Sequence, residues 1–282
     1  MPSLPSNASY EELSLGALDP GRVEAFWRYR AHVRTSQVLL PDGRMDLVAH
    51  CSLRPDGSIA ASWLALCGPA DVPGTVDARP DTVSLGVRFR VGWGGACLGL
   101  SPSVMRNVVV VGGHAAQLIG EPAQQLLRAK SLEEMRSAIE SVVLAKTSQA
   151  VFSAGQNRAL KAIELIRAGS SETLDDLLAS NSRARRTLRR DVVAAAGLPL
   201  RTLGAIFRFQ RAMAMLKSQR HTSLTDLADA VGYTDQSHMT REFRRFSGST
   251  PARPTAAPIV EREFSMAHGR NVQDRNTWAL DN

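Results

Sequence analysis

The residues from Asp235 to Phe246 carry large apolar side chains at a spacing that fits one face of an α-helix. Met239, Phe243 and Phe246 fall at positions i, i+4 and i+7, which a helix brings together on one side. The opposite face carries an amide, hydroxyls and guanidinium groups: Gln236, Ser237, Thr240, Arg241 and Arg244. Such groups form hydrogen bonds with base edges in the major groove of DNA, where arginine matches guanine in bidentate fashion. The spacing therefore predicts a helix that buries one face and presents the other to DNA.

A shorter helix is predicted immediately before it. Ser223 with Asp226 resembles an N-terminal cap. Apolar residues follow at helical spacing: Leu224, Leu227, Ala228 and Val231. Gly232 suits the end of this helix, and Asp235 suits the N-cap of the next one. Two helices joined by a tight turn make a helix-turn-helix unit.

Several short motifs accompany this unit: Gly232-Tyr233, Asp235-Gln236-Ser237-His238, Arg241-Glu242-Phe243, and Gly248 through Thr250-Pro251. Together they resemble the second helix-turn-helix of the AraC/XylS family of transcription regulators. The resemblance implies an all-α domain over residues 151–255, in which a long helix joins two helix-turn-helix units. It also implies binding to double-stranded promoter DNA and recruitment of RNA polymerase, with activation the commoner outcome.

A weakened copy of the unit lies about fifty residues earlier in the chain. Residues 173–177 echo residues 223–227, and Leu188, Val192 and Gly197 echo the apolar positions and the terminal glycine of the later unit. By the same angular argument, three arginines of this copy are expected to face DNA: Arg186, Arg189 and Arg190.

The first unit departs from the family pattern at Leu178, Arg183 and Ala184, and Val192 replaces the expected phenylalanine. Five arginines lie between Arg183 and Arg190, which favours contacts with phosphates over the reading of bases. These departures keep a second hypothesis open, namely a protein-binding modulator that has only non-specific affinity for DNA.

Residues 200–219 lie between the two units and carry apolar side chains at helical spacing: Leu203, Ile206, Phe207, Met213 and Leu216. About twenty residues at 1.5 Å each span roughly 30 Å, near the ~34 Å of one DNA turn. A stiff helix of this length would place both units in successive segments of the major groove on one side of the DNA.

Charge is divided unevenly along the chain. Residues 151–282 hold 20 Lys and Arg against 13 Asp and Glu, whereas residues 1–150 hold 14 of each kind. A basic half beside a neutral half is typical of a polyanion-binding domain attached to a separate regulatory domain.

Residues 1–150 are predicted to form an α+β regulatory domain with a small β-sheet. Turn signals precede two strand-like runs, Met45–Cys51 and Ile59–Cys67. A third run at residues 83–91 alternates apolar with other side chains and continues into a glycine-rich stretch. Further on, the capping box Ser131-Leu132-Glu133-Glu134 opens a helix that either dimerises or joins the domains.

The segments PDGRMDLV (residues 41–48) and GVRFRVG (residues 86–92) are similar to an N-terminal domain often found ahead of this DNA-binding module, whose ligand is generally unassigned. The domain is therefore expected to sense a small molecule or to mediate oligomerisation, and a homodimer stays open. Four residues are candidates for an effector site: Trp63, Arg88, Arg90 and Trp93. The competing interpretation places both arginines on a solvent-facing edge and the tryptophans in the core.

Three cysteines, Cys51, Cys67 and Cys97, lack any C-x-x-C spacing, so neither a disulfide framework nor a metal site is indicated, and no cofactor is expected. A thiol-sensing or metal-sensing regulator is a lesser alternative. Some relatives of the module are fused to alkyltransferase domains that use a Cys nucleophile. Here, however, the strand neighbours His50 and Cys51 would point to opposite faces. No Ser/His/Asp set or phosphate-binding loop is apparent, and an enzyme is not predicted.

The sequence contains no stretch of about eighteen uncharged apolar residues, and its first residues lack the features of a signal peptide. We therefore expect a cytoplasmic protein without a membrane partner. Residues 256–282 are expected to form a C-terminal tail. The sequence as a whole predicts a one-component, sequence-specific transcription regulator.

Overall fold

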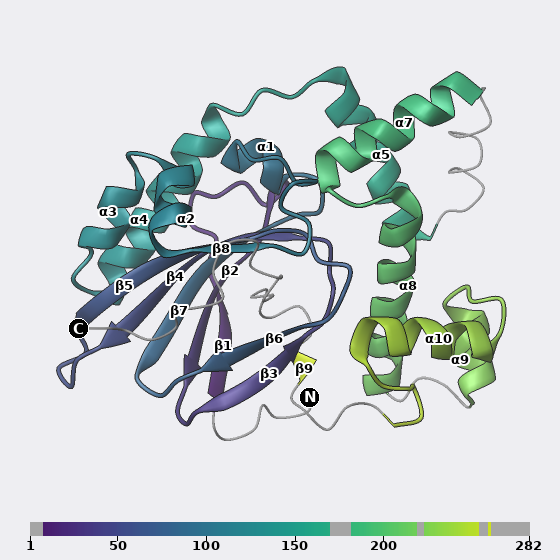
Figure 1. The fold of residues 1–282 in the computed structure, drawn as a ribbon, viewed down its shortest axis with the longest axis horizontal. Helices are drawn as coiled ribbons and strands as arrows, with labels where there is room; N and C mark the ends of the chain where they lie inside the picture. Colours follow the sequence, from purple (N-terminus) through teal and green to yellow (C-terminus); the bar gives the residue numbers. More distant parts are fainter. Residues whose placement is uncertain (1–7, 170–181, 219–222, 254–258, 261–282) are drawn as a thin grey trace.

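The computed structural model describes residues 8–169, 182–218, 223–253 and 259–260 of the 282-residue chain. These residues form a β-rich N-terminal domain followed by a helical C-terminal domain (Figure 1). The strands of the N-terminal domain are β1 (Ala8–Leu13), β2 (Val23–Ala31), β3 (Thr35–Leu39), β4 (Met45–Leu53), β5 (Ile59–Cys67), β6 (Gly74–Ala78), β7 (Thr82–Phe89) and β8 (Val109–Val111). Its helices are α1 (Gly94–Leu98), α2 (Gly112–Ile119), α3 (Ala123–Arg128) and α4 (Leu132–Ser148).

The strands form two sheets. An antiparallel six-stranded sheet has the order β1-β2-β7-β4-β5-β8, and a second sheet has the order β6-β3-β9. Strand β9 (Ile259–Val260) follows the helical domain in the chain and pairs in parallel with β3. The predicted β-sheet is confirmed for β4, β5 and β7. The strand content is larger than expected, because β1, β2, β3, β6, β8 and β9 were not predicted.

Both faces of the six-stranded sheet are covered. Helices α2, α3 and α4 lie over one face (Figure 1), and a buried cluster there combines strand and helix residues, including Leu47, Leu85, Val87, Met135 and Ile139. A second buried cluster joins the other face to the three-stranded sheet and includes Trp27, Tyr29, Leu39, Val48 and Val76. A central strand such as β7 is therefore buried on both sides, as strands in covered sheets are.

The C-terminal domain contains five helices among the described residues: α5 (Ala154–Ala168), α7 (Ser182–Ala196), α8 (Leu200–Lys217), α9 (Leu224–Ala230) and α10 (Gln236–Ser247). Helix α8 lies between two groups, with α5 and α7 towards one end and α9 and α10 towards the other (Figure 1). Its fully buried residues, such as Leu203, Ile206 and Phe209, belong to the core that both groups share. The predicted connecting helix is thus confirmed.

The two domains pack closely against each other. Residues 149–153 connect α4 to α5, and Val91 of the N-terminal domain belongs to the helical core. Glycines allow the close approach: a Cβ added at Gly43 would lie 3.0 Å from Leu203, and one added at Gly197 would lie 2.4 Å from the carbonyl oxygen of Pro102. Gly197 also has a φ of +72°, a conformation that residues with side chains rarely adopt.

Candidate nucleic-acid interface

The second helix-turn-helix unit consists of α9 and α10, and its turns have the predicted caps. Ser223 Oγ accepts a hydrogen bond from the backbone N–H of Asp226 at 3.1 Å. Asp235 Oδ1 accepts one from the N–H of His238 at 2.6 Å. Gly232 between the helices has a φ of +82°, which glycine adopts without steric cost. The local sequence therefore fixes where each helix begins and how the chain turns between them.

Helix α10 buries the face that the spacing predicts. Met239, Phe243 and Phe246 are each at most 1% exposed. The ring of Phe243 meets Phe209 of α8 edge to face, with 4.9 Å between centroids, a geometry that aromatic pairs prefer. This packing holds α10 on the end of α8 and points its other face away from the core.

The opposite face of α10 carries the predicted DNA-contacting residues. Gln236, Ser237, Arg241 and Arg244 are exposed, and Thr240 is half-buried. The hydroxyl of Thr225 in α9 donates to Gln236 Oε1 at 3.3 Å. Neither the side chain of Arg241 nor that of Arg244 has a hydrogen bond or ion pair with another residue in the described part of the chain. Both guanidinium groups are therefore available to an external polyanion.

The first unit is described only from α7 onward. The expected matches at residues 173–178 lie outside the described residues. In α7, Leu188 and Val192 are buried against the helical core, whereas the predicted arginines Arg186, Arg189 and Arg190 are exposed. This helix thus has the same division into a buried apolar face and an exposed basic face as α10.

One arginine of α7 has a neighbouring acid. Arg190 Nη2 lies 3.8 Å from Asp191 Oδ1, but its side chain is 77% exposed. Asp191 forms a shorter pair, at 2.7 Å, with Arg158 of α5. The closer Arg158 pair satisfies most of the charge on Asp191, so Arg190 is only weakly held.

The two basic faces lie on helices at opposite ends of α8 (Figure 1). The 18 residues of α8 correspond to a length of about 27 Å at 1.5 Å per residue. We call α7 and α10 the first and second candidate recognition helices.

A further basic residue of α10, Arg245, escaped the sequence analysis. It follows Arg241 by four residues, so it lies on the same side of the helix. Its Nη2 is 3.3 Å from Asp71 Oδ2 in the N-terminal domain. No local pattern indicates this pair, because its members are 174 residues apart in the chain.

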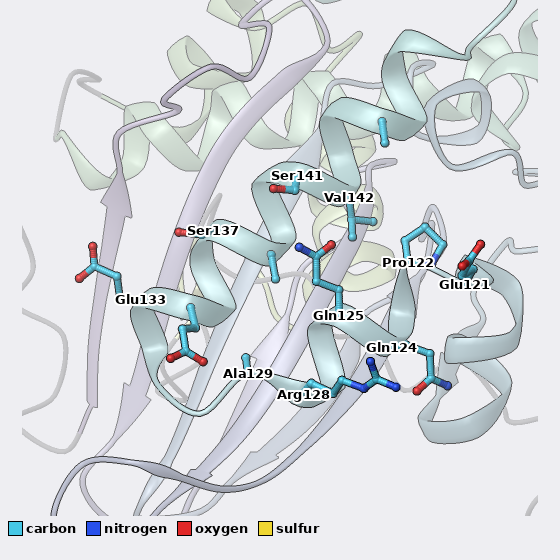
Figure 2. Close-up of a pocket in the computed structure, with 13 residues that line it drawn as sticks. Glu121, Pro122, Gln124, Gln125, Arg128, Ala129, Glu133, Ser137, Ser141 and Val142 are labelled. Carbon is cyan, nitrogen blue, oxygen red and sulfur yellow. The ribbon is translucent and has the colours of Figure 1, made fainter.

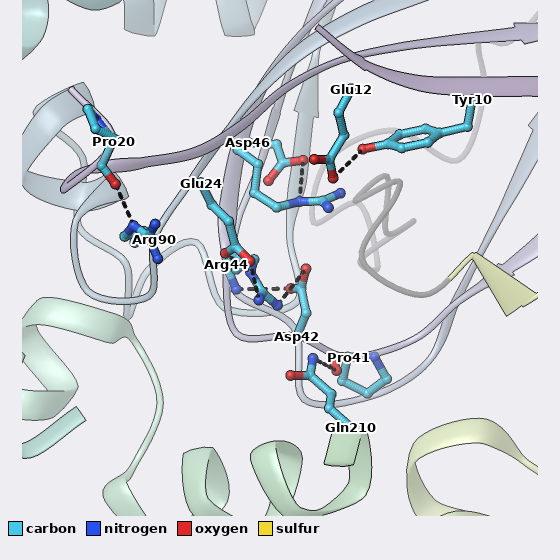
Figure 3. A network of polar contacts seen from close by, with 11 residues as sticks. Tyr10, Glu12, Pro20, Glu24, Pro41, Asp42, Arg44, Asp46, Arg90 and Gln210 are labelled. Carbon is cyan, nitrogen blue, oxygen red and sulfur yellow. Dashed lines mark hydrogen bonds and ion pairs between the residues drawn. The ribbon is translucent and has the colours of Figure 1, made fainter. Parts of the chain in front are cut away.

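The candidate effector residues do not form one site. Trp63 is half-buried on β5 and stacks on His50 at 5.3 Å between centroids. Arg90 donates from Nε to the carbonyl oxygen of Pro20 at 2.7 Å, as Figure 3 shows. Trp93 contacts Phe152 edge to face at 5.0 Å. The side chains thus have separate neighbours, although the backbone N–H of Trp93 donates to the carbonyl oxygen of Arg90 at 2.9 Å.

The expectation that Arg88 lies on a solvent-facing edge is wrong. Arg88 is only 1% exposed, because β7 is a central strand and both faces of its sheet are covered. Arg88 Nε lies 3.5 Å from Asp46 Oδ2, a carboxylate that is itself fully buried. Arg90 at the end of the strand is half-buried.

A cluster of charged groups surrounds this pair (Figure 3). Arg44 forms hydrogen bonds to both carboxylate oxygens of Glu24 and an ion pair to Asp42 at 3.6 Å. Burial raises the pKa of Asp46 to about 7, although Arg88 opposes the shift. Burial also opposes ionisation of Glu24, but hydrogen bonds from Arg44 hold the pKa of Glu24 below its ordinary value. The N-terminal domain thus buries an arginine that the sequence alternation places in solvent.

A shallow groove of about 800 Å³ lies between α3 and α4 (Figure 2). Its lining mixes acids such as Glu121 and Glu133 with Arg128, two glutamines and serines of α4. The mixed charge differs from the basic faces of α7 and α10, so the groove does not extend the candidate DNA-binding surface.

The three cysteines are buried thiols. Burial raises the pKa of Cys51 to about 12 and that of Cys97 to about 11, and it raises the pKa of Cys67 well above the ordinary value. His50 bonds to Ser84 through Nδ1 at 2.8 Å, whereas Cys51 belongs to the opposite core. The described residues contain no cluster of three or more His, Cys, Asp and Glu side chains that would hold a metal ion.

In the described ranges, no single helix is long and apolar enough to cross a membrane. Helices α7 and α8 together have the required length and composition, but they meet at an angle of 59°.

Residues 177–255 match the sequence model of a protein family described as a helix-turn-helix domain. The matched region contains α7 to α10 and both candidate recognition helices. This part of the chain is therefore similar to a helix-turn-helix domain. No curated protein matches the chain.

Solved structures that the chain is similar to include ToxT from Vibrio cholerae O395, with 12% identity and a TM-score of 0.38 over 80% of this chain and 94% of that one. ToxT from the same organism bound to (E)-4-(8-methylnaphthalen-1-yl)but-3-enoic acid gives 10% identity and a TM-score of 0.37 over 88% and 97% of the two chains. At this level of identity and superposition, the likeness supports no statement about function.

Proposed function

We propose that the protein is a sequence-specific DNA-binding transcription regulator of the AraC/XylS type. The observation that carries the proposal is the pair of helices α7 and α10, each with a buried apolar face and an exposed basic face, at opposite ends of α8. Exposed guanidinium groups are suited to phosphates and guanine edges. In α10, the shorter polar side chains Gln236, Ser237 and Thr240 add groups that discriminate between bases.

The experiment is a binding series with the full chain and the DNA upstream of its own and neighbouring genes. Footprinting across a salt range with competitor DNA should give a protected region of about two helical turns that persists at salt concentrations that remove non-specific binding. Diffuse protection that disappears with salt would favour the alternative, a modulator with only non-specific affinity.

Substitution of Arg241 tests whether α10 reads bases. Arg241→Ala should lower affinity for the selected site by about 1 to 3 kcal/mol and relax selectivity at one base position. Arg128→Ala is the matched control, because Arg128 is an exposed arginine on α3 of the N-terminal domain. Equal losses in both variants would mean that net charge, and not base contact, explains the effect.

We further propose that the N-terminal domain responds to a small polar molecule at the buried charged cluster. In the described part of the chain, Arg88 Nη2 and both carboxylate oxygens of Asp46 lack hydrogen-bond partners. Buried polar groups usually have such partners. From this cluster, the loop at Asp42 leads to Pro41, whose carbonyl accepts from Gln210 of α8 at 3.5 Å (Figure 3). A ligand there would lie close to the helix that connects both recognition helices.

Thermal unfolding of the full chain in the presence of small organic acids and bases tests this second proposal. A ligand that binds the cluster should raise the melting temperature of the wild type, and Arg88→Met should remove that rise. A rise that survives Arg88→Met would place the ligand elsewhere.

A further inference from the structure

The contact between Asp71 and Arg245 joins the N-terminal domain to the exposed side of a candidate recognition helix. Arg245 lies in the last turn of α10, and its side chain is 49% exposed. Its guanidinium carbon lies 4.9 Å from the ring centroid of Phe246, so the side chain rests along its own helix. Half of the group therefore remains open to solvent while it pairs with Asp71.

Asp71 is fixed within its own domain. It lies between β5 and β6, and its side chain is 3% exposed. Arg106 donates to both carboxylate oxygens at 2.7 and 3.2 Å, and Asn107 Nδ2 donates at 2.7 Å. Asn107 Oδ1 in turn accepts from the backbone N–H of Asp71 at 2.9 Å. Burial opposes ionisation, but these donors hold the pKa of Asp71 below its ordinary value.

The contacts of Asp71 differ in how easily they can be broken. The pair with Arg245 is longer than the shortest contacts from Arg106 and Asn107. If Arg245 leaves, Asp71 keeps the donors of its own domain, and no buried charge is left unpaired. Arg245 is therefore the exchangeable partner, whereas Arg106 and Asn107 hold the carboxylate in place.

A carboxylate and a phosphate offer a guanidinium group the same pair of anionic oxygens. We propose that Asp71 occupies the place of a DNA phosphate, so that the N-terminal domain and DNA compete for Arg245. The proposal rests on the DNA-binding function proposed above. It assigns Arg245 as a further DNA contact of α10 and Asp71 as the group that masks it. Any change in the N-terminal domain that moves Asp71 then alters DNA affinity, since two events that share one partner are linked.

The test uses the full chain and a random-sequence duplex, because a phosphate contact does not depend on base sequence. Asp71→Asn should raise affinity for the duplex about five-fold at low salt. It should also steepen the dependence of log affinity on log salt by up to about 1, because Arg245 is then free before DNA binds. Asp77→Asn is the matched control, since Asp77 is an exposed acid on β6 and its loss changes net charge equally.

A double-mutant comparison isolates the pair. Arg245→Gln should cost more affinity in the Asp71→Asn background than in the wild type. The proposal is overturned if Asp71→Asn behaves like Asp77→Asn, or if its gain persists when Arg245→Gln is added.

Hydrogen exchange keeps the proposal testable should Asp71→Asn fail to fold. Amides at residues 68–73 should exchange faster in the wild type after the duplex is added, and equally fast in Arg245→Gln without DNA, because this segment then loses its contact with α10 even though Arg106 and Asn107 still hold the Asp71 carboxylate. Unchanged exchange in both experiments would contradict the competition. The footprinting experiment tests whether the protein selects a DNA sequence, whereas these experiments test whether Asp71 and DNA compete for Arg245. A failure of the proposed function and a failure of this proposal can therefore be told apart.

Discussion

At the scale of single residues, the charged pair of Asp46 and Arg88 is the main departure from what the sequence predicts. The alternation of apolar and other side chains along β7 predicts a strand with one buried face and one solvent-exposed face, and it places Arg88 on the exposed face. The structure covers that face with a second sheet. A single strand carries no information about the second sheet, so its burial could not be derived from the strand alone.

Asp46 makes stability depend on pH in a defined window. Its pKa in the folded chain is about 7, against an ordinary value of 3.8. The folded state thus holds the proton more tightly than the unfolded state, and this group makes the free energy of unfolding fall as pH rises from about 4 to about 7. Asp46→Asn should remove that fall, so the pH dependence of the variant and of the wild type should differ by at most about 1.4 kcal/mol per pH unit in this window.

Urea unfolding at a series of pH values measures this difference. Asp77→Asn serves as the control, because its exposed carboxylate should leave the window unchanged. Parallel curves for Asp46→Asn and the wild type would show that Asp46 stays ionised in the folded protein.

At the scale of the elements, the helices of the second unit follow from local sequence. Their caps at Ser223 and Asp235 and the apolar spacing of α10 are confirmed, because caps and periodicity act within a few residues. Strands β1, β2, β3 and β6 were not predicted, because these segments are held in extended form by pairing with other segments of the chain and not by a local pattern. The partner of Arg245 was missed for the same reason.

The first recognition helix is expected to hold phosphates more than it reads bases. Arg189 on α7 is exposed, and its neighbours on that face are arginines and not short polar residues. Arg189→Ala should weaken binding to all DNA sequences by a similar factor and reduce the salt slope by about 1. Titrations of a selected and a random duplex across a salt series measure both quantities. A loss confined to the selected duplex would show that α7 reads bases as well.

At the scale of the whole molecule, the close packing of the two domains is the dominant feature. Gly197 ends α7 beside Pro102 and Pro69 of the N-terminal domain. A methyl group there would meet the backbone of Pro102 and strain a positive φ. Gly197→Ala should lower the free energy of unfolding by about 1 to 3 kcal/mol and loosen the two domains from each other.

Calorimetry tests this expectation, because domains that lose their contact unfold in separate transitions. Gly99→Ala is a close control: Gly99 has a φ of +70°, but an added Cβ would meet no atom within 4 Å. The difference between the two variants therefore reports the domain contact alone. Identical thermograms would mean that backbone strain accounts for the whole effect.

The pairing of β9 with β3 also bears on how the protein can be divided. Strand β9 comes from the far end of the chain and covers an edge of the three-stranded sheet at Val38 and Leu39. A fragment cut between α4 and α5 would lack β9 and leave the backbone N–H and C=O groups of that edge unpaired. Exposed edges of this kind recruit other strands. An isolated N-terminal domain is therefore prone to self-association through β3, and oligomers seen in such a fragment need not reflect those of the complete chain.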